Sequence, residues 1–168
     1  MNVSLEEKLD RLAKAEECLY CILAELVIEL DSFPLQKMAG CHLLDDMAHC
    51  EKLGDLTHAI PRESDVRDYE GMITLREEIR LVEPPAIRFA TIYQFLKPYL
   101  IEAYESLSIT SEDSIRKMIQ EILGVEKCHI EEGLALIATY LNDEEARGSI
   151  ASQVGHLEDV LSSTHAFW

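Results

Sequence analysis

The chain has 168 residues, 48% of them hydrophobic, and it carries a formal net charge of −17 at pH 7. This length fits one domain with a sizeable core, and the apolar content argues against disorder. The acidic balance argues against a nucleic-acid partner, because binding phosphates needs clustered Lys and Arg. The most apolar run, residues 18–24, is too short to span a membrane, and the N-terminus lacks the basic and apolar regions of a signal peptide. We therefore expect a cytoplasmic protein with no membrane partner.

Two long amphipathic segments open the chain and predict an antiparallel helical hairpin. The first runs from about residue 5 to 31 and starts with the capping box Ser-Leu-Glu-Glu at 4–7. The Ser-Phe-Pro sequence at 32–34 leaves room only for a tight turn, with the proline in the first turn of the next helix. The second helix, from 34 to about 60, must therefore return along the first.

A long connection follows this hairpin. Residues 61–85 begin as a polar loop, and the stretch 72–82 could form a short surface helix before the Glu-Pro-Pro sequence at 83–85. Connections of this length are uncommon between adjacent antiparallel helices. A crossover of this size can carry the chain from one hairpin to the far corner of a second one.

The second half of the chain predicts another hairpin and one additional helix. A helix over about 86–107 should be kinked by Pro98, which removes a backbone donor. Residues 110–113 cap the following helix, which continues to about 141. A polar break over 142–148 precedes a fifth helix at 149–161. The expected fold class is therefore all-α.

Two acid-x-x-His pairs interrupt the apolar stripes of these helices. Asp46 and His49 lie on the second helix, and Glu126 and His129 lie on the fourth, each pair on one helical face because of its spacing. Counting residues back along the first helix from the turn at 32–34 places Glu16 at nearly the same height in the hairpin as Asp46 and His49. Buried acids are costly unless they are paired or bind a metal. The pattern therefore predicts a buried metal site, with a metal-free hydrogen-bond network as the alternative.

The register of the first helix is uncertain by about one turn. The fallback for Glu16 is therefore its neighbour Glu17. His42 lies on the same face of its helix as His49, but about 10 Å away along the axis. It is read as a core histidine or a hydrogen-bonding neighbour of the ligands, not as a ligand.

Two hairpins joined by a long crossover, with acid-x-x-His on the second helix of each, resemble the ferritin-like superfamily of dinuclear carboxylate proteins. The resemblance covers about residues 5–141. It implies a ferritin-like four-helix bundle within a single domain of 1–168, with the crossover at 61–85 and the extra helix at 149–161. It also implies two iron ions, or manganese as the alternative, since both suit oxygen and imidazole donors. The implied metal ligands are Glu16, Asp46, His49, Glu126 and His129.

Two features depart from the pattern of that family. Asp46 replaces the usual Glu, so its carboxylate reaches one methylene less far. The helix at 86–107 has no inward acid, and Tyr93 is the inward residue at the level of Glu126 and His129. Either Tyr93 enters the site as a catalytic residue, or the site has one ligand fewer and holds one metal.

Asp45 immediately precedes the first acid-x-x-His pair and matches an acid that often precedes this motif in that family. The resemblance implies that the Asp45 carboxylate fixes a histidine ring from outside the metal site. Tyr93 and the apolar stripes would line the cavity beside the metal. The alternative for Tyr93 is an ordinary core residue.

Three functions follow from these expectations. The first is a non-haem iron or manganese oxidase or oxygenase that acts on a small molecule with O₂. The second is ferroxidase activity or iron storage, and storage requires assembly into a cage. The third is a metal-free, degenerate ferritin-like scaffold that binds a protein partner through its acidic surface or its C-terminal helix. The aromatic tail, Phe167 and Trp168, is compatible with a homodimer contact.

Overall fold

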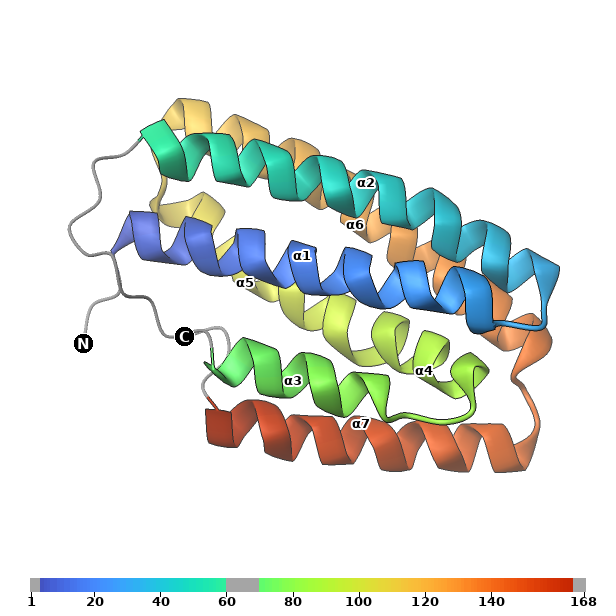
Figure 1. Ribbon diagram of the computed structural model, residues 1–168. Coiled ribbons are helices and arrows are strands. Elements are labelled where there is room, and N and C mark those ends of the chain that lie inside the picture. Colours follow the sequence, from blue (N-terminus) through green and yellow to red (C-terminus); the bar gives the residue numbers. More distant parts are fainter. Residues whose placement is uncertain (1–3, 60–69, 165–168) are drawn as a thin grey trace.

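The computed structural model describes residues 4–59 and 70–164, and all regular elements within these ranges are helical (Figure 1). The predicted all-α class is therefore confirmed for this part of the chain. The polar segment at 60–69 and the aromatic tail at 165–168 lie outside the described residues. No helix in the described ranges combines the length and apolarity that crossing a membrane would require.

The first hairpin consists of α1 (Leu5–Glu29) and α2 (Phe33–Ala59), which pack against each other along their length. The side chain of Ser4 caps α1 by accepting a hydrogen bond from the backbone N–H of Glu7 at 3.1 Å. At the other end, the backbone N–H of Leu30 closes the last turn on the carbonyl of Leu26. The predicted hairpin is confirmed, and each helix lies within about two residues of its expected bounds.

The second hairpin pairs a long composite helix with α6 (Asp113–Tyr140). The composite helix consists of α4 (Pro85–Thr91), the π-helical segment η1 (Ile92–Leu96) and α5 (Lys97–Thr110). In Figure 1, α2 and α6 lie side by side, and α1 lies above α5. The two hairpins therefore pack with all four long helices around one interior.

Where a kink at Pro98 was predicted, the composite helix contains the π-helical segment η1 immediately before this proline. The backbone N–H of Lys97 donates to the carbonyl of Ile92, five residues earlier, and Pro98 lies at the start of α5. Segments of this kind are a common cause of helix irregularity. Tyr93 and Lys97 are both fully buried around this turn.

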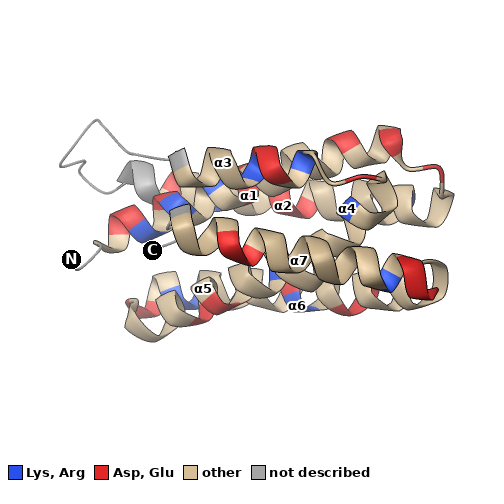
Figure 2. Cartoon of the chain, turned by 90° about the horizontal axis from the view of Figure 1, so that it is seen from below, with Lys and Arg blue, Asp and Glu red and all other residues tan. Residues whose placement is uncertain are grey.

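The remaining two helices, α3 (Glu70–Arg80) and α7 (Glu144–Thr164), lie side by side over the α1 and α4 edge of the bundle (Figure 2). The predicted short helix at 72–82 corresponds to α3. The predicted fifth helix starts five residues earlier than expected, because Asp143 caps it by accepting a hydrogen bond from the N–H of Ala146 at 2.8 Å. Acidic residues in the first turn also favour a helix start.

The interior is apolar on both sides of a central polar layer. Burying a leucine or isoleucine stabilises the fold by about 1.5–3 kcal/mol, so this core supplies most of the driving force for packing. On α1, Leu12 and Leu19 flank Glu16, and on α6 Ile122 precedes Glu126 by one turn. The polar layer is therefore sealed by apolar side chains. Other fully buried apolar residues include Leu9, Leu23, Leu26, Leu53, Phe89, Leu100, Leu107 and Ile119.

Candidate metal centre

All four long helices contribute polar side chains to one buried layer. Helix α1 provides Glu16, α2 provides Asp46 and His49, and α6 provides Glu126 and His129. The exposed fraction is 0% for all three carboxylates and 3% for both histidines. The three-residue spacing within each pair explains why acid and histidine point to the same side of their helix. Ligand atoms of Glu16, Asp46, His49 and Glu126 lie within 4.8 Å of one another.

Each of the three carboxylates has one oxygen with a hydrogen-bond partner and one without. Glu16 Oε1 accepts from the Tyr104 hydroxyl at 2.5 Å, and Asp46 Oδ1 and Glu126 Oε2 accept from Lys97. The other oxygens, Glu16 Oε2, Asp46 Oδ2 and Glu126 Oε1, are buried with no hydrogen-bond partner. Buried acceptors normally have a partner, and each one lacking it costs about 1–3 kcal/mol. Together with His49, these three carboxylates form a buried group that could hold a metal ion.

His49 completes this set of unpartnered atoms. Its Nδ1 lies 3.2 Å from Glu126 Oε1 and 3.6 Å from Glu16 Oε1, but it forms no hydrogen bond. Burial favours the neutral ring, but the neighbouring carboxylates of Glu126 and Glu16 outweigh it and raise the pKa of His49 to about 9. Without a metal, a proton on this imidazole partly balances the negative charge of the carboxylates.

Helix α5 supplies Lys97, which lies at the centre of the other half of the layer. Its side chain is fully buried, and Nζ lies 2.9 Å from Asp46 Oδ1, 2.7 Å from Glu126 Oε2 and 3.3 Å from His129 Nδ1. Burial opposes the charge, but Asp46 and Glu126 outweigh it and raise the pKa of Lys97 above its usual range. The side chain is therefore an ammonium ion that donates to two carboxylate oxygens beside His129 Nδ1.

The pKa values of the carboxylates diverge within this layer. Burial works against the ionised form of Glu126, yet Lys97 and the two histidines lower its pKa well below the usual value. Burial and the charge of Glu126 raise the pKa of Glu16 and of Asp46. Such divergent values in one cluster are typical of functional sites.

His129 and His42 connect the layer to the surface between α2 and α6. His129 Nδ1 lies 3.3 Å from Lys97 Nζ and 3.2 Å from Glu126 Oε1, and its Nε2 lies 3.1 Å from Asp45 Oδ2. His42 stacks on His129 with ring centroids 3.8 Å apart. Its Nε2 lies 3.1 Å from the exposed carboxylate of Glu132.

Tyr93 lies beside the cluster and contacts His42 on α2. The Tyr93 hydroxyl lies 2.7 Å from His42 Nδ1, and burial raises the pKa of this tyrosine far above its usual value, so the hydroxyl donates. The ring packs against α6 at Gly133, where an added Cβ would lie only 2.3 Å from it. At this level of the helix, the sequence predicted either Tyr93 as part of the site or one ligand fewer. The structure instead places Lys97, one turn further along, against the carboxylates.

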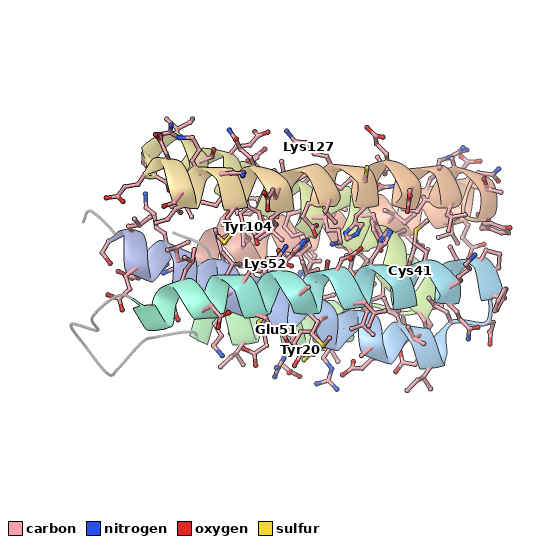
Figure 3. The ribbon with its side chains drawn as sticks, turned by 90° about the horizontal axis from the view of Figure 1, so that it is seen from above. Tyr20, Cys41, Glu51, Lys52, Tyr104 and Lys127 are labelled. Carbon is pink, nitrogen blue, oxygen red and sulfur yellow. The ribbon has the colours of Figure 1, made fainter. Side chains whose placement is uncertain are left out.

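Sequence reasoning did not identify Lys97 or Tyr104. Both lie on the buried stripe of the composite helix with Tyr93, Leu100 and Leu107, and a lysine on such a stripe was a detectable signal. A second signal was the charge of the predicted cluster, because three buried carboxylates require positive partners. In Figure 3, Tyr104 lies between α6 and the α1–α2 hairpin, whereas Lys127 projects outward from α6.

Two surface pockets lie away from this layer. One of about 430 Å³ lies between α5 and α7 and includes Pro98, Tyr99 and Leu161. The other, of about 260 Å³, lies at the end of the bundle near Leu30 and Tyr140. Neither is lined by a residue of the polar layer.

Comparisons with protein-family models, curated proteins and solved structures give no match for this chain.

Proposed function

We propose that the protein binds one divalent metal ion, iron or manganese, through Glu16 Oε2, Asp46 Oδ2, His49 Nδ1 and Glu126 Oε1. The observation that carries this proposal is that these four buried atoms have no hydrogen-bond partner, while their residues bring ligand atoms within 4.8 Å of one another. A cation bonded to all four would remove the cost of burying them unpaired.

The donor set supports iron or manganese. Carboxylate oxygens with one imidazole suit hard to borderline divalent ions, whereas thiolate ligands would favour softer metals. The charge also fits. A divalent ion and the Lys97 ammonium together carry three positive charges, which balance the three carboxylates when His49 is neutral. This balance favours one ion beside Lys97 over two.

We further propose that the metal serves an oxidase or oxygenase reaction on a small molecule. Glu16, Asp46, His49 and Glu126 would hold the ion, and iron or manganese bound there would supply redox chemistry with O₂. Lys97 holds Asp46 and Glu126 in place, and Tyr104 holds Glu16, so the ligands are oriented before any metal arrives. The two hairpins and the helical crossover support a ferritin-like relationship as part of this proposal.

Metal analysis of purified protein tests the binding step. Protein expressed with added iron and manganese should carry about one ion per chain. His49→Ala and Glu16→Gln should lose most of it, and Glu132→Gln, whose exposed carboxylate pairs with the outer His42, should retain it. Wild-type protein that binds neither metal, even when both are supplied in excess, would refute the proposal.

A metal-free ionic network is the second candidate, and Lys97 specifically favours it. This ammonium and a protonated His49 already provide two positive charges for three carboxylates without any metal. In that case the helical bundle is a scaffold for a partner, and Glu126→Gln should leave stability unharmed or improve it. Under the metal proposal, the same substitution should lower metal content while the folded state persists.

A further inference from the structure

We propose that the buried layer is a two-cation site in which the Lys97 ammonium permanently occupies the second cation position. This inference rests on the proposed metal site and adds to it the reason why the centre takes one ion. Removing the ammonium should open a second metal position in the same layer.

The atoms around Lys97 Nζ have the chemistry of a metal site. Two carboxylate oxygens and one imidazole nitrogen, from Asp46, Glu126 and His129, lie 2.7–3.3 Å from Nζ. These are hydrogen-bond distances, and the same donor types bind iron and manganese at shorter range. The second position therefore has ligands from α2 and α6 already directed at one point.

Two carboxylates connect the second position to the first. Asp46 and Glu126 each direct one oxygen to Lys97 and leave the other oxygen unpartnered. A carboxylate with one oxygen on each of two cations is a bridging ligand. Glu16 and His49 lie at the first position, and His129 Nδ1 lies 3.3 Å from Lys97 Nζ and 3.2 Å from Glu126 Oε1. With a cation at each position, Asp46 and Glu126 would each have one oxygen available to either ion.

Charge and space both explain why Lys97 excludes a second metal. A second divalent ion beside the ammonium would exceed the charge of the three carboxylates, and the Nζ atom already fills the point where the ion would bind. Lys97→Ala removes the charge and frees the volume of the side chain. Two divalent ions with one hydroxide derived from water would then balance the carboxylates again.

The experiment measures metal stoichiometry after equilibration with Mn²⁺ and removal of unbound ions. Wild-type protein should bind about one Mn²⁺ per chain, and Lys97→Ala and Lys97→Gln should each bind about two. Electron paramagnetic resonance provides an independent readout. An isolated Mn²⁺ ion is expected in the wild type, and a spin-coupled pair in both Lys97 variants.

Two control variants test the role of the positive charge and exclude surface effects. Lys97→Arg keeps the positive charge and should not exceed one ion. Lys127→Ala removes a lysine that is 53% exposed and paired with Glu105, and it should match the wild type in both readouts. These controls exclude a general rise in metal binding caused by the loss of any lysine.

The outcomes distinguish this inference from the proposed function. One ion in the wild type and still one in Lys97→Ala and Lys97→Gln would overturn the inference alone. No ion in the wild type but binding of a coupled pair in Lys97→Ala would refute the proposed function and support the second position. Variants that do not fold even in excess Mn²⁺ would also count against the inference, because two ions should replace the lost charge.

Discussion

The imidazole rings of His42 and His129 stack with their centroids 3.8 Å apart and their planes 18° apart. Each ring extends across to the opposite helix. His42 on α2 contacts Glu132 on α6, and His129 on α6 contacts Asp45 on α2. On their inner sides, the rings contact Tyr93 and Lys97. This reciprocal arrangement joins α2 to α6 and separates the buried layer from solvent.

Acid should destabilise the protein through His42. Burial and the neighbouring His129 lower the pKa of His42 from 6.5 to about 4. A lowered folded-state pKa gives stability that is present above the unfolded value and is lost as the pH falls through the folded value. Between about pH 6.5 and 4, Tm should therefore fall more steeply for the wild type than for His42→Gln, which cannot titrate. Parallel Tm profiles over this range would contradict the assignment.

Gly133→Ala should destabilise the folded state. An added Cβ would lie 2.3 Å from the Tyr93 ring, which is buried and cannot move away freely. Overpacking of this kind costs about 1–3 kcal/mol in the free energy of unfolding. Gly124→Ala on the same helix is the matched control, since nothing lies within 4 Å of its added Cβ. It should raise stability by about 0.5–1 kcal/mol in urea unfolding, because alanine favours a helix.

Metal affinity should rise with pH. The pKa of His49 is raised to about 9, so below that pH the metal must displace a proton from its ring. The apparent Mn²⁺ affinity should increase by about tenfold per pH unit over about pH 6.5–8.5. Calorimetric titration in buffers of different ionisation enthalpy should detect the released proton. An affinity that is flat over this range would exclude His49 as a ligand.

The metal-free protein should show the opposite trend with pH. A raised folded-state pKa gives stability that is fully present below the unfolded value of 6.5 and is lost as the pH rises through about 9. Thermal melting of metal-free wild type should therefore show a declining Tm over this range. His49→Gln should lack this decline, and a similar decline in the variant would assign the effect to another group.

Tyr104→Phe should weaken both the fold and the metal site. The hydroxyl donates to Glu16 Oε1 at 2.5 Å inside the core, and its loss leaves a second oxygen of this carboxylate without a partner. The expected loss is about 1–3 kcal/mol in the free energy of unfolding. Outer contacts of this type also change metal affinity by about 10–100-fold. Tyr140→Phe, at a tyrosine that is 48% exposed, should change neither quantity.

The sequence by itself determined the helices and the direction of their polar residues. Helical periodicity is local, so the stripes that contain Glu16, Asp46 and Glu126 could be read without knowing their partners. The turn at 32–34 also fixed the α1–α2 hairpin, because a connection that short allows only adjacent antiparallel helices. The inward acids were therefore predictable from spacing alone.

Only the tertiary structure decided how the acids are compensated. Counting across the second turn led to Tyr93, whereas η1 and the packing of α5 against α6 bring Lys97 to the carboxylates. A lysine on an apolar stripe can be buried or extend to solvent, and the choice depends on charges from other helices. Which oxygen of Asp46 or Glu126 meets Lys97 is likewise a property of side-chain packing. The free energy of a buried charge depends on its neighbours in space, and those are set by the fold.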